Sequence, residues 1–183
     1  MNHSEMKTAR LSLFPLCMDN LQEVHSWQSD PATMKYINPP HTEISQTVEY
    51  LEWVTGQWQK EHQTYYSYGI ALNDVLIGEI GFSFGCGKCG RCVKGEAAIG
   101  YTIHQKFSGY GYEQEAIEAI IAHCFSVLNA DKIKMSCDTE SIAELQVIQR
   151  LGMQLIQDNE DCEYNDGKPF KRNIYVLNNP NLQ

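Results

Sequence analysis

The chain has 183 residues, which at roughly 100–200 residues per domain predicts one domain spanning residues 1–183. Hydrophobic residues make up 43% and charged residues 20%, a globular composition that excludes wholesale disorder. No apolar run approaches the ~18 residues of a membrane span, and the polar residues 1–10 lack the apolar core of a secretory signal. We therefore expect a cytoplasmic domain with no membrane segment.

The net charge is −9, from 14 basic and 23 acidic residues. A nucleic-acid-binding domain normally carries a basic face, so we expect no nucleic-acid partner. Residues 158–166 hold five acids and no base. They could attract a cationic substrate, but we interpret them as a solvated acidic loop.

Apolar periodicity and turn residues predict the elements of the first half. In chain order these are a strand (9–15), a short helix (19–27), a helix that begins between residues 42 and 45, and strands at 66–72, 76–84 and 96–103. Asn73 and Asp74 form the turn between the second and third strands. A loop rich in glycine and cysteine, residues 85–95, precedes the last of these strands.

The best-defined element of the second half is a helix over residues 111–128, with one apolar stripe that packs on a sheet. A strand (132–137), a helix (141–151) that ends at Gly152 and two closing strands (153–157 and 173–177) follow. Because the early strands are linked by a hairpin, the fold is not doubly wound. We predict an α/β fold in which helices flank a central mixed β-sheet.

A glycine-containing loop lies between the strand at 96–103 and the long helix: Ser108, Gly109, Tyr110, Gly111, Tyr112 and Glu113. Glycines let backbone N–H groups approach a ligand closely, and a helix N-terminus carries a partial positive charge. Together they predict a phosphate-binding site, although two glycines here could also form a simple turn. The Gly-x-Ser-x-Gly sequence around Ser83 is a chance match, because no helix follows it.

Cys86, Cys89 and Cys92 are spaced so that three thiolates could bind one soft metal ion such as zinc. Structural zinc takes four ligands, and no fourth cysteine or histidine follows nearby, so a partner chain would have to complete the site. The alternative is a redox-sensitive hairpin tip with no metal.

Several motifs in the expected order resemble the GNAT superfamily of acetyl-CoA-dependent N-acetyltransferases, and most closely its RimJ/RimL-type branch. They are IGYTI at 99–103, GYEQEA at 111–116, DTES at 138–141, RLGM at 150–153 and RNIYVL at 172–177. The resemblance covers about residues 9–177, which is nearly the whole chain.

The resemblance implies a GNAT-like fold in which the strand at 96–103 splays from its neighbour. Backbone groups of Tyr101 and Ile103 would then pair with pantetheine, and the glycine loop would bind the diphosphate of acetyl-CoA. Asp138 stands where the family has an asparagine beside the coenzyme. The acceptor amine would enter on the other side, between the first two helices and the loop at 34–41, and attack the thioester directly.

Ser141 matches the family's serine near the coenzyme sulfur and is the candidate proton donor. It also fits a capping box with Glu144 at the start of a helix, and one residue could serve both roles. Ala98 stands where the branch usually has an acid, so Glu96 and Glu79 are the candidates for the general base, with an ordered water as the alternative. Glu113 replaces a small residue of the family pattern and would bring a negative charge near the diphosphate.

We therefore predict an N-acetyltransferase acting on a primary amine, either a protein N-terminus or a small molecule, with a homodimer as the candidate assembly. The net charge slightly favours a free cationic amine. Two alternatives stay open: a GNAT-like module that senses acyl-CoA without turnover, and a metal- or redox-responsive protein that uses Cys86, Cys89 and Cys92.

Overall fold

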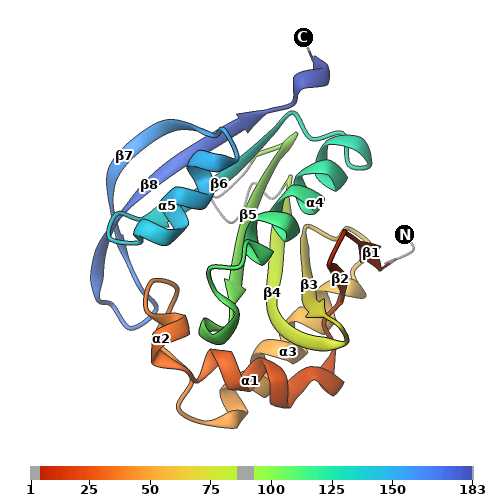
Figure 1. Ribbon diagram of the computed structural model, residues 1–183, viewed down its shortest axis with the longest axis vertical. Helices are drawn as coiled ribbons and strands as arrows, with labels where there is room; N and C mark the ends of the chain where they lie inside the picture. The colour runs from red at the N-terminus through yellow and green to blue at the C-terminus, as the bar shows by residue number, and fades with distance from the viewer. Residues whose placement is uncertain (1–4, 86–92, 183) are drawn as a thin grey trace.

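The computed structural model describes residues 5–85 and 93–182 (Figure 1). Its strands are β1 (Met6–Lys7), β2 (Leu11–Pro15), β3 (Tyr65–Leu72), β4 (Val75–Phe84), β5 (Glu96–Ile103), β6 (Lys132–Asp138), β7 (Gln154–Glu163) and β8 (Pro169–Asn178). Its α-helices are α1 (Leu21–Gln28), α2 (Pro31–Met34), α3 (Ile44–Trp58), α4 (Tyr112–Ser126) and α5 (Ile142–Arg150). Within these ranges no helix is long and apolar enough to cross a membrane.

The strands form one eight-stranded sheet in the order β1-β2-β3-β4-β5-β6-β8-β7. All neighbouring strands run antiparallel except β5 and β6, which run parallel. A chain crossing from β5 to a parallel β6 needs a long connection, and α4 supplies it. The predicted mixed sheet flanked by helices is confirmed.

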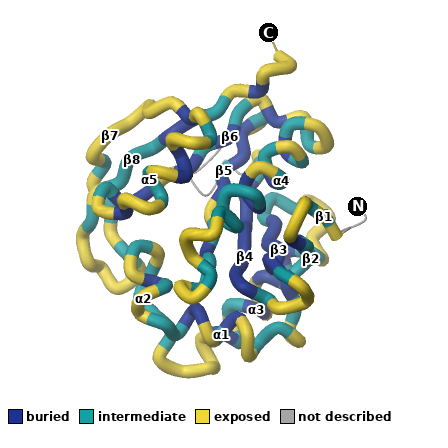
Figure 2. Tube along the Cα trace, viewed as in Figure 1, coloured by how far each residue is buried: buried dark blue, intermediate teal, exposed yellow. Residues whose placement is uncertain are grey.

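The hairpin between β3 and β4 forms where the sequence predicts it. Asn73 and Asp74 have φ angles of 49° and 66°, the left-handed conformation that a two-residue hairpin turn requires at both positions. Both β3 and β4 are buried on both faces along most of their length (Figure 2). Ser83 lies inside β4, so the Gly-x-Ser-x-Gly sequence is part of a strand, as expected.

The main core lies between the sheet and the helices α4 and α5, which cross in front of it in Figure 1. Ile117, Ile120 and Cys124 of α4 are fully buried, which confirms the apolar stripe. Val147 and Ile148 of α5 extend the same core. The helix α4 is thereby fixed on the sheet with its N-terminus beside the end of β5.

A second, smaller core joins α1 and α3 to the sheet. Trp27 of α1 and Leu51 and Val54 of α3 are fully buried in it, together with Leu16 after β2. The sequence missed the short α2, whose first turn is capped by Asp30 through the backbone N–H groups of Ala32 and Thr33. Together these helices fix the loop between α2 and α3 near the sheet.

The acidic stretch at residues 158–166 is largely exposed, as predicted, but most of it is a strand and not a loop. Most of it belongs to β7, whose antiparallel pairing with β8 places Glu160 opposite Arg172 and Asp161 opposite Lys171. Both pairs are ion pairs, with 2.7 Å between Lys171 Nζ and Asp161 Oδ1. Two of these negative charges are therefore neutralised across the strand pair by basic residues that lie about ten residues later in the sequence.

Candidate active site

The sheet is split between β5 and β6. The two strands pair only over their first residues, at Glu96–Lys132, Ala97–Ile133 and Ala98–Lys134, and then separate. From Ile99 onward the edge of β5 that faces β6 has no strand partner among the described residues. A parallel pair that opens in this way leaves backbone N–H and C=O groups available to an extended ligand.

Two cavities lie on either side of this split. A large cavity of about 850 Å³ is lined by residues of α1, α3 and the α2–α3 loop, of β3, β4, β5 and β6, and of the β7–β8 hairpin. A small cavity of about 430 Å³ lies between the end of β5, α2 and α5. Residues that line both cavities form the junction between them: Tyr36, Ile37, Tyr101, Thr102 and Glu144.

Glu79 of β4 lines the large cavity and is only 8% exposed. The Tyr50 hydroxyl of α3 donates to its Oε2 at 2.9 Å, and the Gln28 amide of α1 donates to its Oε1 at 3.2 Å. Burial raises the pKa of Glu79 to about 7, and these two hydrogen bonds offset part of the rise. A fixed carboxyl with such a pKa can accept a proton near neutral pH.

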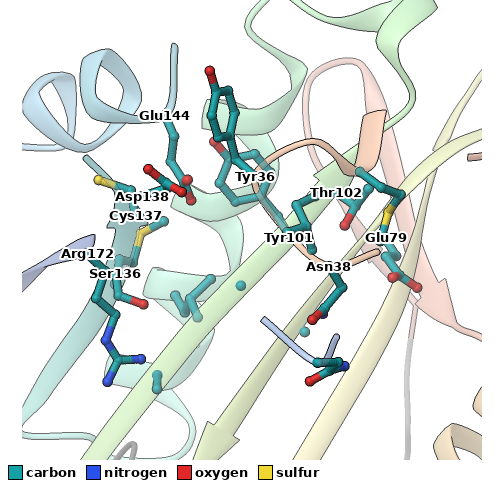
Figure 3. Close-up of a pocket in the computed structure, with 18 of the residues that line it drawn as sticks. Tyr36, Asn38, Glu79, Tyr101, Thr102, Ser136, Cys137, Asp138, Glu144 and Arg172 are labelled. Atoms are coloured by element: carbon teal, nitrogen blue, oxygen red, sulfur yellow. The ribbon is translucent and has the colours of Figure 1, made fainter. Parts of the chain in front are cut away.

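Glu144 and Asp138 lie together on the opposite wall of the large cavity (Figure 3). Burial, with a smaller effect from the negative charge of Asp138, raises the pKa of Glu144 to about 7. Asp138 Oδ1 accepts the backbone N–H of Glu140 at 2.8 Å, and its Oδ2 accepts the Tyr164 hydroxyl. Asp138 is thus placed in the large cavity with both oxygens bonded, and it does not line the small one.

Ser141 precedes α5 and lines the small cavity, where it is 7% exposed. Its side chain makes no capping hydrogen bond, so the predicted capping box with Glu144 does not form. Glu144 instead faces the cavities. The helix start therefore leaves the Ser141 hydroxyl available to a ligand in the small cavity.

The glycine loop forms as predicted, with left-handed φ angles of 86° at Gly109 and 77° at Gly111. Within the described part of the chain no side chain caps α4, which begins directly after Gly111. Of the loop residues, Ser108 and Glu113 line the small cavity, as does Ile103, while Gly109, Tyr110, Gly111 and Tyr112 line neither cavity.

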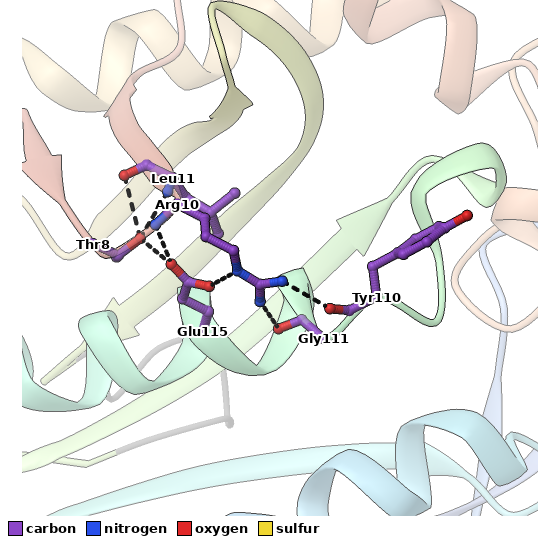
Figure 4. Close-up of polar contacts among 6 residues, drawn as sticks. All are labelled: Thr8, Arg10, Leu11, Tyr110, Gly111 and Glu115. Carbon is purple, nitrogen blue, oxygen red and sulfur yellow. Dashed lines mark hydrogen bonds and ion pairs between the residues drawn. The ribbon is translucent and has the colours of Figure 1, made fainter.

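Arg10, which lies between β1 and β2, makes hydrogen bonds to this loop that the sequence did not predict (Figure 4). Its guanidinium donates to the carbonyl oxygens of Tyr110 at 3.1 Å and Gly111 at 3.4 Å and to Glu115 Oε2 at 2.6 Å. In a planar trans peptide the C=O and the following N–H point in opposite directions. Arg10 thereby turns the N–H groups of Gly111 and Tyr112 away from itself.

Glu113 is the acidic residue of the loop, and its charge would repel a negatively charged ligand. It lines the small cavity, and its Oε2 is buried without a hydrogen-bond partner in the described structure. An unpaired buried carboxylate oxygen is costly and would repel an anion.

Glu96, the other candidate base, lies away from both cavities. Its carboxylate pairs with Lys132 at 3.2 Å and Lys134 at 2.7 Å and accepts the Val93 N–H at 3.1 Å. Although burial acts in the opposite direction, these contacts lower its pKa. Glu96 holds β5 and β6 together where they still pair, and this placement argues against a role as base.

The predicted metal ligands Cys86, Cys89 and Cys92 lie outside the described residues. Within residues 5–85 and 93–182, no three potential ligands gather in a way that could bind a metal ion. Zinc therefore has no support from the structure.

Sequence reasoning missed Gln28, Tyr50, Glu144 and Arg10 as parts of the site. Tyr50 falls in the apolar stripe predicted for α3, so the sequence alone indicated a core residue. The structure shows that its hydroxyl donates a hydrogen bond to Glu79. The sequence predicted Glu144 only as the capping-box partner of Ser141, and its place in both cavities became visible only in the structure.

Comparison with known proteins places these features in a family. The family described as "Acetyltransferase (GNAT) domain" matches residues 10–154. The uncharacterized N-acetyltransferase p20 of Bacillus licheniformis is 26% identical over 160 residues, covering 85% of this chain and 87% of that protein. The uncharacterized N-acetyltransferase YoaA of Bacillus subtilis is 24% identical over 178 residues, covering 96% and 97%.

Solved structures share the fold over nearly the whole chain. A GNAT-family acetyltransferase from Bacillus anthracis superposes with a TM-score of 0.79 at 20% identity, covering 96% of this chain and 99% of that one. RimL, a ribosomal L7/L12 alpha-N-protein acetyltransferase solved with coenzyme A, gives 0.81 at 17% identity, covering 96% and 98%. The microcin C7 self-immunity acetyltransferase MccE, solved with acetyl-CoA and AMP, gives 0.77 at 18%, covering 93% of each.

Proposed function

Since this chain belongs to the GNAT acetyltransferase family, we propose that it transfers an acetyl group from acetyl-CoA to a primary amine. The observation that carries the proposal is the split between β5 and β6 with a cavity on either side. A two-substrate transfer needs two binding spaces that meet at one point, and Tyr101 lies at that point.

The small cavity suits the coenzyme. The free edge of β5 offers backbone groups at Tyr101 and Ile103 to the amide groups of pantetheine. The uncapped start of α4 offers the N–H groups of Gly111, Tyr112 and Glu113 to the diphosphate. A Cβ added at Gly109 would meet no other atom within 4 Å, so the loop has open space beside it.

The large cavity suits the amine. Carboxylates outnumber cations on its wall, and both cations, Lys134 and Arg172, are ion-paired with glutamates. We propose a cationic small-molecule amine as the acceptor, because a negative cavity attracts an ammonium group. RimL acts on a protein N-terminus according to its name, and that acceptor is the second candidate.

Glu79 is the general base in this proposal. Its carboxylate faces the large cavity, and the hydroxyl of Tyr50 and the amide of Gln28 fix its orientation. An amine that binds there as an ammonium ion loses a proton to Glu79 and then attacks the thioester carbonyl. Ser141 faces the coenzyme side and is proposed as a contact for the coenzyme.

The test begins with calorimetric titration of acetyl-CoA, followed by thiol release with small cationic amines and with peptides that have free N-termini. Glu79→Gln should bind acetyl-CoA as the parent does but lose about 10²-fold in turnover, along with the rising acidic limb of the pH profile. Glu49→Gln, an exposed glutamate on the same helix as Tyr50, is the matched control and should keep parental activity. Unchanged turnover in Glu79→Gln would reject Glu79 as the base.

A further inference from the structure

One carboxyl group lies at the junction of the two cavities, and the mechanism above does not use it. Glu144 of α5 lines both cavities, whereas Glu79 lines only the large one and Ser141 only the small one. If the coenzyme occupies the small cavity and the amine the large one, as proposed above, the reacting thioester must lie at the junction. Glu144 is the carboxyl group placed to reach it.

The surroundings of Glu144 let it hold a proton to a higher pH than an ordinary glutamate does. No hydrogen bond or ion pair engages its carboxyl in the described structure, and Asp138 adds a negative charge nearby. Burial and this charge raise its pKa to about 7. Tyr101 and Cys137 line the large cavity together with Glu144. Burial raises the pKa values of both groups, and the charge of an ionised Glu144 raises them further.

We propose that the protonated carboxyl of Glu144 is the acid that protonates the leaving sulfur of the coenzyme. Glu79 first passes the proton of the bound ammonium ion to solvent, which restores its carboxylate. The neutral amine nitrogen then forms a C–N bond with the acetyl carbonyl carbon, and the second proton that the nitrogen must lose passes to Glu79. The C–S bond breaks with its electron pair on sulfur, and the sulfur takes the Glu144 proton to become a thiol. Glu79 then releases a proton to solvent and Glu144 takes one up, so that the overall reaction yields an amide and a thiol.

A carboxyl group suits this step better than the hydroxyls nearby. Thiols ordinarily have a pKa near 8.5, so transfer from an acid with a pKa of about 7 is downhill. Burial raises the pKa of the Tyr101 hydroxyl well above its usual value, so transfer from it to a thiolate is uphill. A serine hydroxyl is a weaker acid still, and that of Ser141 faces the coenzyme side alone.

Several ionisable groups share this space and bear on the pH dependence. They are Asp138 and Cys137 on β6, Tyr101 on β5, Glu113 on α4, Arg150 on α5, and Lys35 and Tyr36 after α2. Lys35 is exposed and its charge interacts with Asp138 and Glu140 rather than with Glu144. The nearby acidic charge therefore favours the protonated form of Glu144.

The test compares Glu144→Gln with Glu140→Gln, an exposed glutamate just before α5, and with Ser141→Ala. Glu144→Gln should bind acetyl-CoA in calorimetry as the parent does, lose about 10²-fold in thiol release at saturating amine, and lose the falling limb of the pH profile above pH 7. Glu140→Gln should match the parent. Parental turnover in Glu144→Gln, loss of the rising limb instead of the falling one, or a larger loss in Ser141→Ala would each overturn the proposal.

A second measurement needs no coenzyme. Carbon-13 NMR of protein labelled at the glutamate carboxyls should show two signals that titrate near pH 7, one absent in Glu79→Gln and the other absent in Glu144→Gln. A Glu144 signal that titrates near pH 4 would overturn the proposal. A parent that binds no acetyl-CoA would overturn the proposed function as well, whereas an active parent with a fully active Glu144→Gln variant overturns the proton donor alone.

Discussion

At Glu113 the chain places a carboxylate in the small cavity, with one oxygen buried and unbonded in the described structure. A negative charge about 5 Å from a diphosphate would cost about 3 kcal/mol at an effective dielectric constant of ~20. Glutamine keeps the size of the side chain and removes the charge. The local sequence therefore works against tight coenzyme binding at this residue.

We expect Glu113→Gln to bind acetyl-CoA about tenfold more tightly, since solvent screening reduces the full Coulomb cost. Calorimetric titration at low and high salt measures the effect, which should shrink as salt increases. Glu118→Gln is the control: this glutamate is exposed farther along the same helix and accepts a hydrogen bond from Gln114. Equal affinity of Glu113→Gln and the parent would show that the Glu113 carboxylate turns away from the diphosphate.

At the scale of elements, the start of α4 is held in place by the segment before β2. Arg10 bonds to two loop carbonyls and to Glu115, and its guanidinium lies 4.6 Å from the ring centre of Tyr112. The Thr8 hydroxyl and the Arg10 N–H add two further bonds to Glu115. This network spans more than 100 residues of sequence, so only the folded chain brings it together.

Arg10→Gln should weaken acetyl-CoA binding about fivefold while changing thiol release at saturating coenzyme little, because the loop N–H groups lose their fixed orientation. Calorimetry and steady-state kinetics separate the two effects. Lys7→Gln removes a neighbouring exposed cation that pairs with Glu5 and should leave the affinity unchanged. A fall in turnover with no change in affinity would contradict this role.

At the scale of the whole molecule, the raised pKa of Glu79 links stability to pH. A carboxyl whose folded pKa is about 7 instead of 4.5 favours the folded state fully below pH 4.5, and this contribution is lost as pH rises through 7. The loss is about 3 kcal/mol. The lowered pKa values of His41 and His123 act in the opposite direction, so the difference between variants is the informative quantity.

We expect the parent to lose about 3 kcal/mol more unfolding free energy than Glu79→Gln between pH 5 and pH 8. Urea unfolding at each pH measures it, with Glu49→Gln as the variant that should follow the parent. If the unfolding free energies of the parent and Glu79→Gln changed equally with pH, Glu79 would ionise at its ordinary pKa in the folded protein.

The sequence by itself determined most of the architecture of this protein. The apolar stripe of α4, the Asn73–Asp74 turn and the bounds of β5 are local patterns, so the residues that encode them are neighbours along the chain. The family resemblance rested on the same local motifs around the glycine loop and α5. For that reason the fold class and the position of the glycine loop could be predicted.

The tertiary structure alone decided which groups meet in the site. Glu79 is hydrogen-bonded by residues of α1 and α3, and Glu144 lies beside Asp138 of β6. Arg10 reaches the glycine loop from the segment between β1 and β2. Acidic residues of β7 likewise form ion pairs with basic residues of β8, which the pairing of the two strands places opposite them. Burial and long-range pairing set the pKa of each carboxyl, and neither is a property of the nearby sequence.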